Sequence, residues 1–326
     1  MACLIDIFRY RVSNACVQRR PGIYRTITPV QTRQFAQLVG LSALWGSSFM
    51  LLRIAAPVIG PNVLAAGRIG LATLTLTLIM LAMKQRWPWR HWRELALLGA
   101  LSVAVPFLLF AWAALRLPAG YSALLNSTAV VFGTLASAWL KEDTLTARKL
   151  LGCALGFVGV GLIVRLGPVD PTSQVLLAAL ACTGAAACYG LATPLMKRAT
   201  TRMEPLAIAA GIHFISLVML LPGAAVSWPT AHFTPGALAA MLMLGVVTSG
   251  LAYWVHLRLI RHVSPVAAIS PAFMIPVFGV TWGHLFLGEE LGSGIWGGGA
   301  LILLATALVT GFNPLKRWRA REDARP

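Results

Sequence analysis

Arg68 is a charged side chain within a long run of apolar residues, 62–83. A guanidinium in such surroundings can bind a carboxylate or another anionic group of a ligand. Placing it in a membrane costs between a few and about 10 kcal/mol, so its position needs a physical reason. Two interpretations stay open. The side chain can face an internal cavity and bind substrate, or it can extend toward the nearer helix end in a structural role.

Three histidines, His213, His256 and His284, also fall within apolar runs. Histidine is the side chain that gains and loses a proton near neutral pH. None of the ten Asp and Glu residues lies in the middle of a predicted helix, so a proton carrier within the membrane would have to be a histidine. His284 is the best placed, in a run that contains two prolines. The alternative for each is a satisfied or interfacial side chain.

Other polar and aromatic residues in these runs are candidates for a substrate pathway. Aromatic rings can stack on a ring or a cation, and hydroxyl or amide groups can hydrogen-bond a ligand. A proline frees a carbonyl one turn earlier, which is tolerated where a helix faces protein or a wet cavity. Simple packing and interhelical hydrogen bonding remain the alternative explanation. The candidates are Trp45, Ser48, Tyr121, Asn126, Ser127, Tyr189, Pro271 and Pro276.

The elements that carry these residues are predicted to be membrane-spanning helices. The chain of 326 residues is 58% hydrophobic and 11% charged, whereas soluble proteins have roughly 25% charged residues. A bilayer core of about 30 Å needs roughly 20 apolar residues per helix. Because backbone groups in lipid must be satisfied within each segment, ten apolar runs predict ten helices. The runs are 35–55, 62–83, 94–115, 119–140, 147–165, 174–196, 205–226, 236–257, 265–287 and 293–312.

Basic residues between the runs predict the orientation of the chain. With a cytoplasmic N-terminus, 23 of the 27 Lys and Arg residues fall inside and only Arg53, Arg116 and Arg165 fall outside. Such a bias is typical of bacterial-type inner-membrane proteins, here with both termini cytoplasmic. Residues 1–34 and 313–326 are predicted to be basic cytoplasmic tails. The first tail is expected to be disordered, or to result from a misassigned start codon.

The chain contains an internal repeat. Residues 118–161 align with 265–308 without a gap, at an offset of 147, and an offset of 144 aligns the region upstream. We therefore expect two five-helix repeats, over 35–165 and 173–312. Because five is odd, the second copy must cross the membrane in the opposite sense, so that Glu142 faces the cytoplasm and its counterpart Glu289 faces outside. The fold class is thus an all-α integral membrane protein of two inverted-topology repeats, as in many transporters.

The sequence resembles the drug/metabolite transporter superfamily, and within it the EamA-type permeases, over about residues 40–312. The resemblance rests on Leu-Trp-Gly-Ser-Ser-Phe at 44–49, on Arg53 and Arg68, and on a Leu-x-Glu connection in each half that precedes a glycine-rich helix. It implies export of a metabolite, amino acid or drug. The halves differ, because Ile212 stands where the first half has Arg68, so they cannot line a site with equivalent chemistry.

The sequence favours a secondary transporter that works by alternating access on a small molecule, in a lipid bilayer. We expect no metal, no cofactor and no nucleic-acid partner, because no Cys/His metal spacing, ATP-binding loop or continuous basic patch occurs. A lipid flippase of the same fold is the first alternative. An intramembrane enzyme is the second, although no nucleophile motif or mid-helix aspartate supports it. Small-residue pairs such as Gly152 and Gly156 leave open whether the protein is a monomer or a homodimer.

Overall fold

The structure, a computed structural model, describes residues 30–117, 119–163, 172–287 and 294–312, and all regular elements in these ranges are helical. In the first half, the helices are α2 (Thr32–Ile59), α3 (Pro61–Ala82), η1 (Trp89–His91), α4 (Trp92–Gly99), η2 (Ala100–Ala104), α5 (Val105–Ala113), α6 (Ala119–Ser127), α7 (Ala129–Trp139) and α8 (Ala147–Ile163). In the second half, they are α9 (Ser173–Ala199), α10 (Pro205–Ser227), η3 (Trp228–Thr230), α11 (Pro235–Leu242), η4 (Met243–Leu251), α12 (Ala252–Ile260), α13 (Pro265–Ile269), α14 (Pro271–Leu287) and α15 (Gly294–Thr310).

Helices occupy all ten of the predicted apolar runs, and seven of the helices described are long and apolar enough to cross a membrane. The seven spans are 32–59, 61–82, 89–113, 173–199, 205–230, 235–260 and 265–286. The other three runs hold shorter helices. The predicted run 119–140 is divided between α6 and α7, while α8 and α15 have 17 residues each. The protein is therefore a multi-pass membrane protein.

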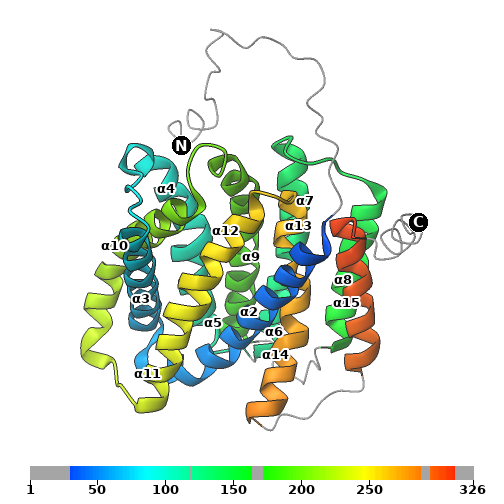
Figure 1. The fold of residues 1–326 in the computed structure, drawn as a ribbon. Coiled ribbons are helices and arrows are strands. Elements are labelled where there is room, and N and C mark those ends of the chain that lie inside the picture. Colours follow the sequence, from blue (N-terminus) through cyan, green and yellow to red (C-terminus); the bar gives the residue numbers. More distant parts are fainter. Residues whose placement is uncertain (1–29, 118, 164–171, 288–293, 313–326) are drawn as a thin grey trace, which may run out of the picture.

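The helices form one bundle with roughly aligned axes (Figure 1). α8 packs against α15 at one edge of the bundle, and α3 packs against α10 at the other (Figure 1). Between these edges, α2 packs against α14, and α7 packs against α9. Each of these close pairs joins a helix of the first half to a helix of the second half. The two halves are therefore interleaved rather than separate domains.

Glycines allow the closest of these helix crossings. A Cβ atom at Gly46 of α2 would lie 2.7 Å from the Cβ of Phe278 in α14, and one at Gly190 of α9 would lie 2.6 Å from the Cβ of Phe132 in α7. Such separations leave no room for a side chain larger than hydrogen. Small residues that let two backbones approach are the usual means of packing helices in membranes.

Two π-helical turns interrupt otherwise α-helical spans. η2 follows Gly99, and η4 contains Gly245. A Cβ at Gly99 would lie 2.9 Å from the carbonyl oxygen of Ile212, and one at Gly245 would lie 2.8 Å from the carbonyl oxygen of Arg68. A π-turn adds a residue to the turn and often marks a functional site. Here both turns lie where a neighbouring helix approaches closely.

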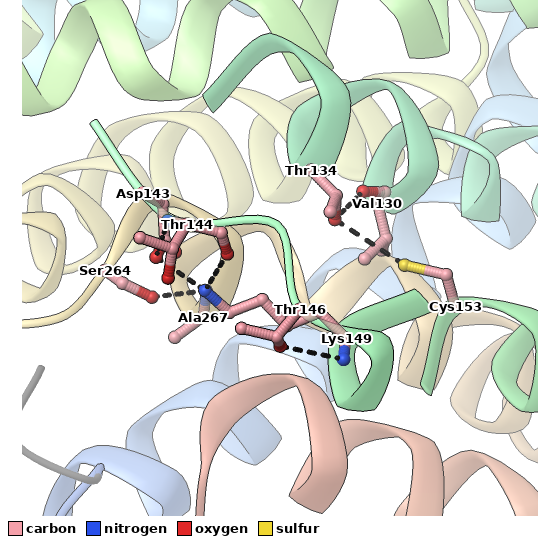
Figure 2. Close-up of polar contacts among 9 residues, drawn as sticks. All are labelled: Val130, Thr134, Asp143, Thr144, Thr146, Lys149, Cys153, Ser264 and Ala267. Carbon is pink, nitrogen blue, oxygen red and sulfur yellow. Dashed lines mark hydrogen bonds and ion pairs between the residues drawn. The ribbon is translucent and has the colours of Figure 1, made fainter. Parts of the chain in front are cut away.

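The connection between α7 and α8 is fixed by a buried ion pair (Figure 2). The Nζ of Lys149 lies 2.5 Å from Oδ1 of Asp143 and donates to the carbonyl oxygen of Thr144 at 2.8 Å. The same Asp143 oxygen accepts a hydrogen bond from the backbone N–H of Thr144 at 2.8 Å. Both charged side chains are almost fully buried, 10% exposed for Lys149 and 1% for Asp143. The turn is thus held by charge rather than by apolar packing.

Three further ion pairs lie where α9 ends and α4 and α10 begin, which we call the basic end of the bundle. Arg198 pairs with Glu142, and it also donates to the carbonyl oxygen of Leu140. Arg202 lies 2.6 Å from Glu94, and Arg261 makes two hydrogen bonds of 3.1 Å to Glu204. The first two pairs join the halves of the chain, whereas the third lies within the second half.

Candidate functional site: a buried cavity between the two halves

A cavity of about 130 Å³ lies between the two halves of the chain. The first half contributes α2, α3, η2, α5, α6 and α7, and the second half contributes α9, α12, α13 and α14. The space between the helices of a bundle is a common location for small-molecule sites. Many of the side chains that line the cavity are polar or aromatic. The lining includes Trp45, Ser48, Phe49, Arg68, Ser102, Phe107, Phe110, Asn126, Tyr189, Thr193, Tyr253, His256 and Pro271.

Arg68 carries the positive charge of this cavity. Its side chain is 6% exposed. Its Nε donates to the Oγ of Ser249 at 2.6 Å, and its Nη2 donates to the Oγ1 of Thr248 at 3.3 Å. Both partners are neutral, and no ion pair found among the described residues includes Arg68. Since these bonds use two of its five N–H groups, three donors remain for a ligand.

The ring of Phe107 covers one face of this guanidinium. The Cζ of Arg68 lies 3.9 Å from the ring centroid, which is a close cation–π contact. Two hydroxyl groups at one edge and a ring on one face fix the orientation of the guanidinium. Its remaining edge is therefore held in position before a ligand arrives.

The π-turn η4 positions both hydroxyl partners of Arg68. Thr248 and Ser249 are neighbours in this turn and are buried, at 1% and 0% exposure. The carbonyl oxygen of Thr248 also accepts a hydrogen bond from Nε1 of Trp45 at 3.0 Å. One backbone turn thus connects the arginine of α3 to the tryptophan of α2.

Aromatic rings form much of the remaining wall. Phe110 stacks on Tyr189 with centroids 6.1 Å apart and meets Phe49 edge-on at 5.8 Å. Trp45 meets the imidazole of His256 edge-on at 5.0 Å. Rings in these geometries combine a large apolar surface with defined positions. The cavity can therefore hold a flat, apolar body beside a single cation.

Two polar atoms in the lining are buried without a hydrogen-bond partner in the described part of the chain. They are the Oγ of Ser48 and the Nδ1 of His256, in side chains that are 7% and 8% exposed. Buried polar groups normally have a partner, and an exception at a cavity suggests that a ligand or water supplies it. These atoms are candidate ligand contacts.

A second, smaller cavity lies beside the first and shares Phe49, Leu52 and Phe110 with it. Its other lining residues include Arg53 and Ser122. These residues lie near the end of α2 and the start of α6, toward the end of the bundle opposite the basic end. The second cavity thus lies on that side of the central cavity.

The structure brings together many of the residues that the sequence singled out. Trp45, Ser48, Arg68, Asn126, Tyr189, His256 and Pro271 all line the central cavity. Four other candidates lie elsewhere. Ser127 is buried and donates to the carbonyl oxygen of Leu124 at 2.6 Å, and Pro276 lies one turn farther along α14, outside the lining. His213 is buried with its Nδ1 2.8 Å from the Ala209 carbonyl oxygen, and His284 is exposed near the end of α14. The side chain of Tyr121 lies outside the described residues.

Sequence reasoning missed the partners of Arg68. Ser249, Thr248 and Phe107 are far from Arg68 in the sequence, and neither a hydroxyl nor a phenyl group is unusual in a membrane helix. One signal was present for the first two. They belong to a Thr-Ser-Gly run, 248–250, in the middle of an apolar segment, where polar side chains need partners.

Apolar helices around a cavity that contains the oriented guanidinium of Arg68 define a multi-pass membrane protein. The sequence profile of the EamA-like transporter family matches this chain twice, over residues 35–165 and 176–311. The chain belongs to the EamA-like transporter family, and it is a membrane transporter.

Several relatives align over most of their length. One from Streptantibioticus cattleyicolor, named "Probable terminal-alkyne amino-acid exporter", is 26% identical and covers 86% of this chain and 94% of its own. Protein PecM from Dickeya dadantii is 26% identical, with 84% and 91% covered. The inner membrane transporter YedA of Escherichia coli K12 is also 26% identical, with 88% and 92% covered. A solved crystal structure of 17% identity covers 85% of this chain and 98% of its own with a TM-score of 0.71, which shows a shared fold.

Proposed function

We propose that this protein is a secondary transporter that exports a small molecule with an anionic group by alternating access. The observation that carries the proposal is the guanidinium of Arg68, which is buried, oriented by Ser249 and Phe107, and paired with no acid in the described residues. A buried cation normally has a partner of opposite charge. In this proposal the substrate supplies that partner, and the exporter names of the relatives support the direction of transport.

The proposal includes ten spans in two inverted repeats. The helix contacts support it because they occur in matched pairs. Gly46 and Gly190 are related by the upstream repeat offset, and each is met by a Phe-Gly pair, 278–279 or 132–133, of the other half. Likewise Gly245 meets the backbone of Arg68 while Gly99 meets the backbone of its counterpart Ile212. Contacts exchanged in this way are expected from a two-fold relation between repeats.

Alternating access also needs closures that open. At the basic end, Arg198–Glu142 and Arg202–Glu94 join the halves, and all four side chains are partly exposed. Exposed ion pairs contribute about 0–1 kcal/mol each, so they can close the structure and still separate in each cycle. We propose that the basic end is the cytoplasmic side of an inner membrane, with both termini there. The Lys and Arg bias and the similarity to YedA support this orientation and location.

For a coupling proton we propose His256. Of the three candidate histidines, it lines the central cavity and has a buried nitrogen without a partner in the described residues. The groups around it are Trp45, Tyr253 and, across the cavity, Arg68. His213 lies behind Tyr253, with ring centroids 4.9 Å apart. If coupling uses His256, then His256→Gln makes transport independent of an imposed pH gradient while His213→Gln leaves that dependence in place.

The experiment that tests the function is transport in everted membrane vesicles that contain the protein. Labelled organic acids, amino acids and cationic drugs are offered to wild type and to Arg68→Ala. The proposal expects accumulation of at least one anionic or zwitterionic compound, which the substitution removes while the protein still inserts. Transport of cationic drugs alone, unchanged in Arg68→Ala, would contradict it.

A further inference from the structure

We propose that the central cavity selects a monoanion with a flat, apolar body, such as an arylalkyl carboxylate, over the α-amino acid with the same body. The inference rests on the proposed function, since it names the substrate class for the Arg68 site. It is also narrower than that function, which would hold for a zwitterion as well.

The lining of the cavity carries a net positive charge. Arg68 is the one Lys, Arg, Asp or Glu residue among the described side chains that line the cavity. The described acids, Glu94, Glu142, Asp143 and Glu204, lie at helix ends or in connections, and three of them already have basic partners at the basic end. The field inside the cavity is therefore positive. A monoanion neutralises it, whereas a zwitterion leaves the net charge unchanged.

The guanidinium of Arg68 has one edge left for a ligand. Its Nε and one N–H of Nη2 are bonded to Ser249 and Thr248, and Phe107 covers one face. A carboxylate must therefore bind at the remaining edge. In an α-amino acid the ammonium group is two bonds from the carboxylate carbon, which places it within several Å of the guanidinium. At that separation two like charges repel each other.

The lining offers an ammonium group no acidic partner among its described side chains. The described lining offers it neutral acceptors, above all the Oγ of Ser48 and the Nδ1 of His256, and the faces of rings. Hydrogen bonds to neutral groups are weaker than those to a carboxylate. If His256 becomes protonated, it loses its acceptor and adds a second positive charge. An ammonium group is therefore held less well than it is in water.

The walls of the cavity are largely aromatic. Six rings line the cavity, those of Trp45, Phe49, Phe107, Phe110, Tyr189 and Tyr253. The pairs among them are stacked or edge-on, as described above, and a planar ring can extend either arrangement. The hydroxyl groups of Ser102 and Thr193 in the lining already donate to backbone carbonyls one turn earlier. An apolar, flat body is consequently the best match.

The test compares three ligands that share a phenylethyl body. Phenylpropionate has the carboxylate alone, phenylalanine has both the carboxylate and the ammonium, and phenethylamine has the ammonium alone. Their binding to the purified full-length protein in lipid nanodiscs is measured by isothermal titration calorimetry. We expect phenylpropionate to bind at least tenfold more tightly than phenylalanine, and phenethylamine to bind more weakly than both.

Variants then assign the discrimination to the cavity. Arg68→Ala should lower the affinity for phenylpropionate at least tenfold and reduce the preference over phenylalanine. Arg116→Ala is the matched control, because Arg116 packs over Trp112 with its Cζ 4.3 Å from that ring and does not line the cavity. It should leave all three affinities unchanged. The ligand ranking is measured on the wild type, so it stands even if Arg68→Ala fails to fold.

The outcomes separate this inference from the function on which it rests. Phenylalanine that binds as tightly as phenylpropionate, in a manner that depends on Arg68, overturns the inference and leaves the proposed function intact. Phenethylamine that binds most tightly, regardless of Arg68, overturns both. If none of the three binds at millimolar concentration, the aromatic body is wrong, and the vesicle experiment decides the function separately.

Discussion

The Nε atom of Arg68 lies 2.6 Å from the Oγ of Ser249, a residue 181 positions later in the chain and in the other half of the bundle. This bond joins α3 to the π-turn η4, and it sets the direction in which the guanidinium points. We expect Ser249→Ala to raise the KM for an anionic substrate about tenfold to a hundredfold, since one hydrogen bond to a charged group contributes about 1.5–3 kcal/mol. The measurement is the concentration dependence of vesicle transport.

The control for that substitution is Ser47→Ala. Ser47 lies in α2, and its Oγ donates to the carbonyl oxygen of Leu44 at 2.7 Å. The control substitution therefore also removes a serine hydroxyl, but one that does not bond to Arg68. An equal rise in KM for both variants would mean that Ser249 has no special relation to the site.

The ion pair between Arg198 and Glu142 should hold the basic end closed. We expect Glu142→Arg to increase the rate at which a cysteine placed at Ser48 is labelled from the basic side, by about twofold to fivefold, because an exposed pair contributes up to about 1 kcal/mol. The background lacks the native cysteines, and the reagent is a membrane-impermeant maleimide. Adding Arg198→Glu should restore slow labelling, because the pair is rebuilt with its charges exchanged.

Glu204→Arg provides the matched control. The Glu204–Arg261 pair lies at the same end and has the same chemistry, but both residues belong to the second half. Its loss should leave the labelling of Ser48→Cys unchanged. Faster labelling in this variant would show that the loss of any charge at the basic end increases access to position 48. The Arg198–Glu142 pair would then have no special role in closing that end.

The buried pair of Lys149 and Asp143 (Figure 2) should contribute to stability rather than to transport. Lys149→Met leaves a buried carboxylate without its partner, and we expect it to lower the free energy of unfolding by about 3–5 kcal/mol. Combining it with Asp143→Asn should recover part of that loss, because the uncompensated charge is then removed. Thermal unfolding in detergent measures both, and a single variant as stable as the wild type would contradict the expectation.

The glycine at the second π-turn is expected to tolerate no side chain. A Cβ at Gly245 would lie 2.5 Å from the Cβ of Leu71, so Gly245→Ala forces the helices apart and should lower the melting temperature by several degrees, at a cost of about 1–3 kcal/mol. Gly40→Ala is the control, because no atom lies within 4 Å of a Cβ there. It should be neutral or slightly stabilising, since alanine favours helix.

The apolar runs of the sequence predict where the helices lie, and seven of the residues that the sequence singles out line the cavity. Apolar runs locate helices well because lipid leaves the backbone no other means of hydrogen bonding. Arg68 stood out because a charge in such a run is costly. His284 was ranked above His256 on the prolines near it, yet His256 is the histidine that lines the cavity. Periodicity within one helix does not say which face meets the other half of the chain, and only the packed structure resolves that.

The partners of Arg68 could not be predicted for the same reason. Its contacts to Thr248 and Ser249 depend on how η4 packs against α3, and a π-turn shifts the register of every residue after it. The Phe107 ring, in turn, lies beside the guanidinium through α5. These contacts connect segments far apart in the sequence, so no local pattern carries them.

The matched glycines also bear on how a duplicated protein can diversify. Gly99 and Gly245 meet the backbones of Ile212 and Arg68, and backbone contacts of this kind do not depend on which side chain the partner residue carries. One copy can thus acquire a charged side chain for a ligand while its twin keeps an apolar one, with the scaffold unaffected. A saturation-mutagenesis map of the whole chain should therefore be symmetric at the glycines, with equal intolerance in both copies. At the paired positions 68 and 212 it should be asymmetric, and this contrast would separate inherited architecture from acquired specificity.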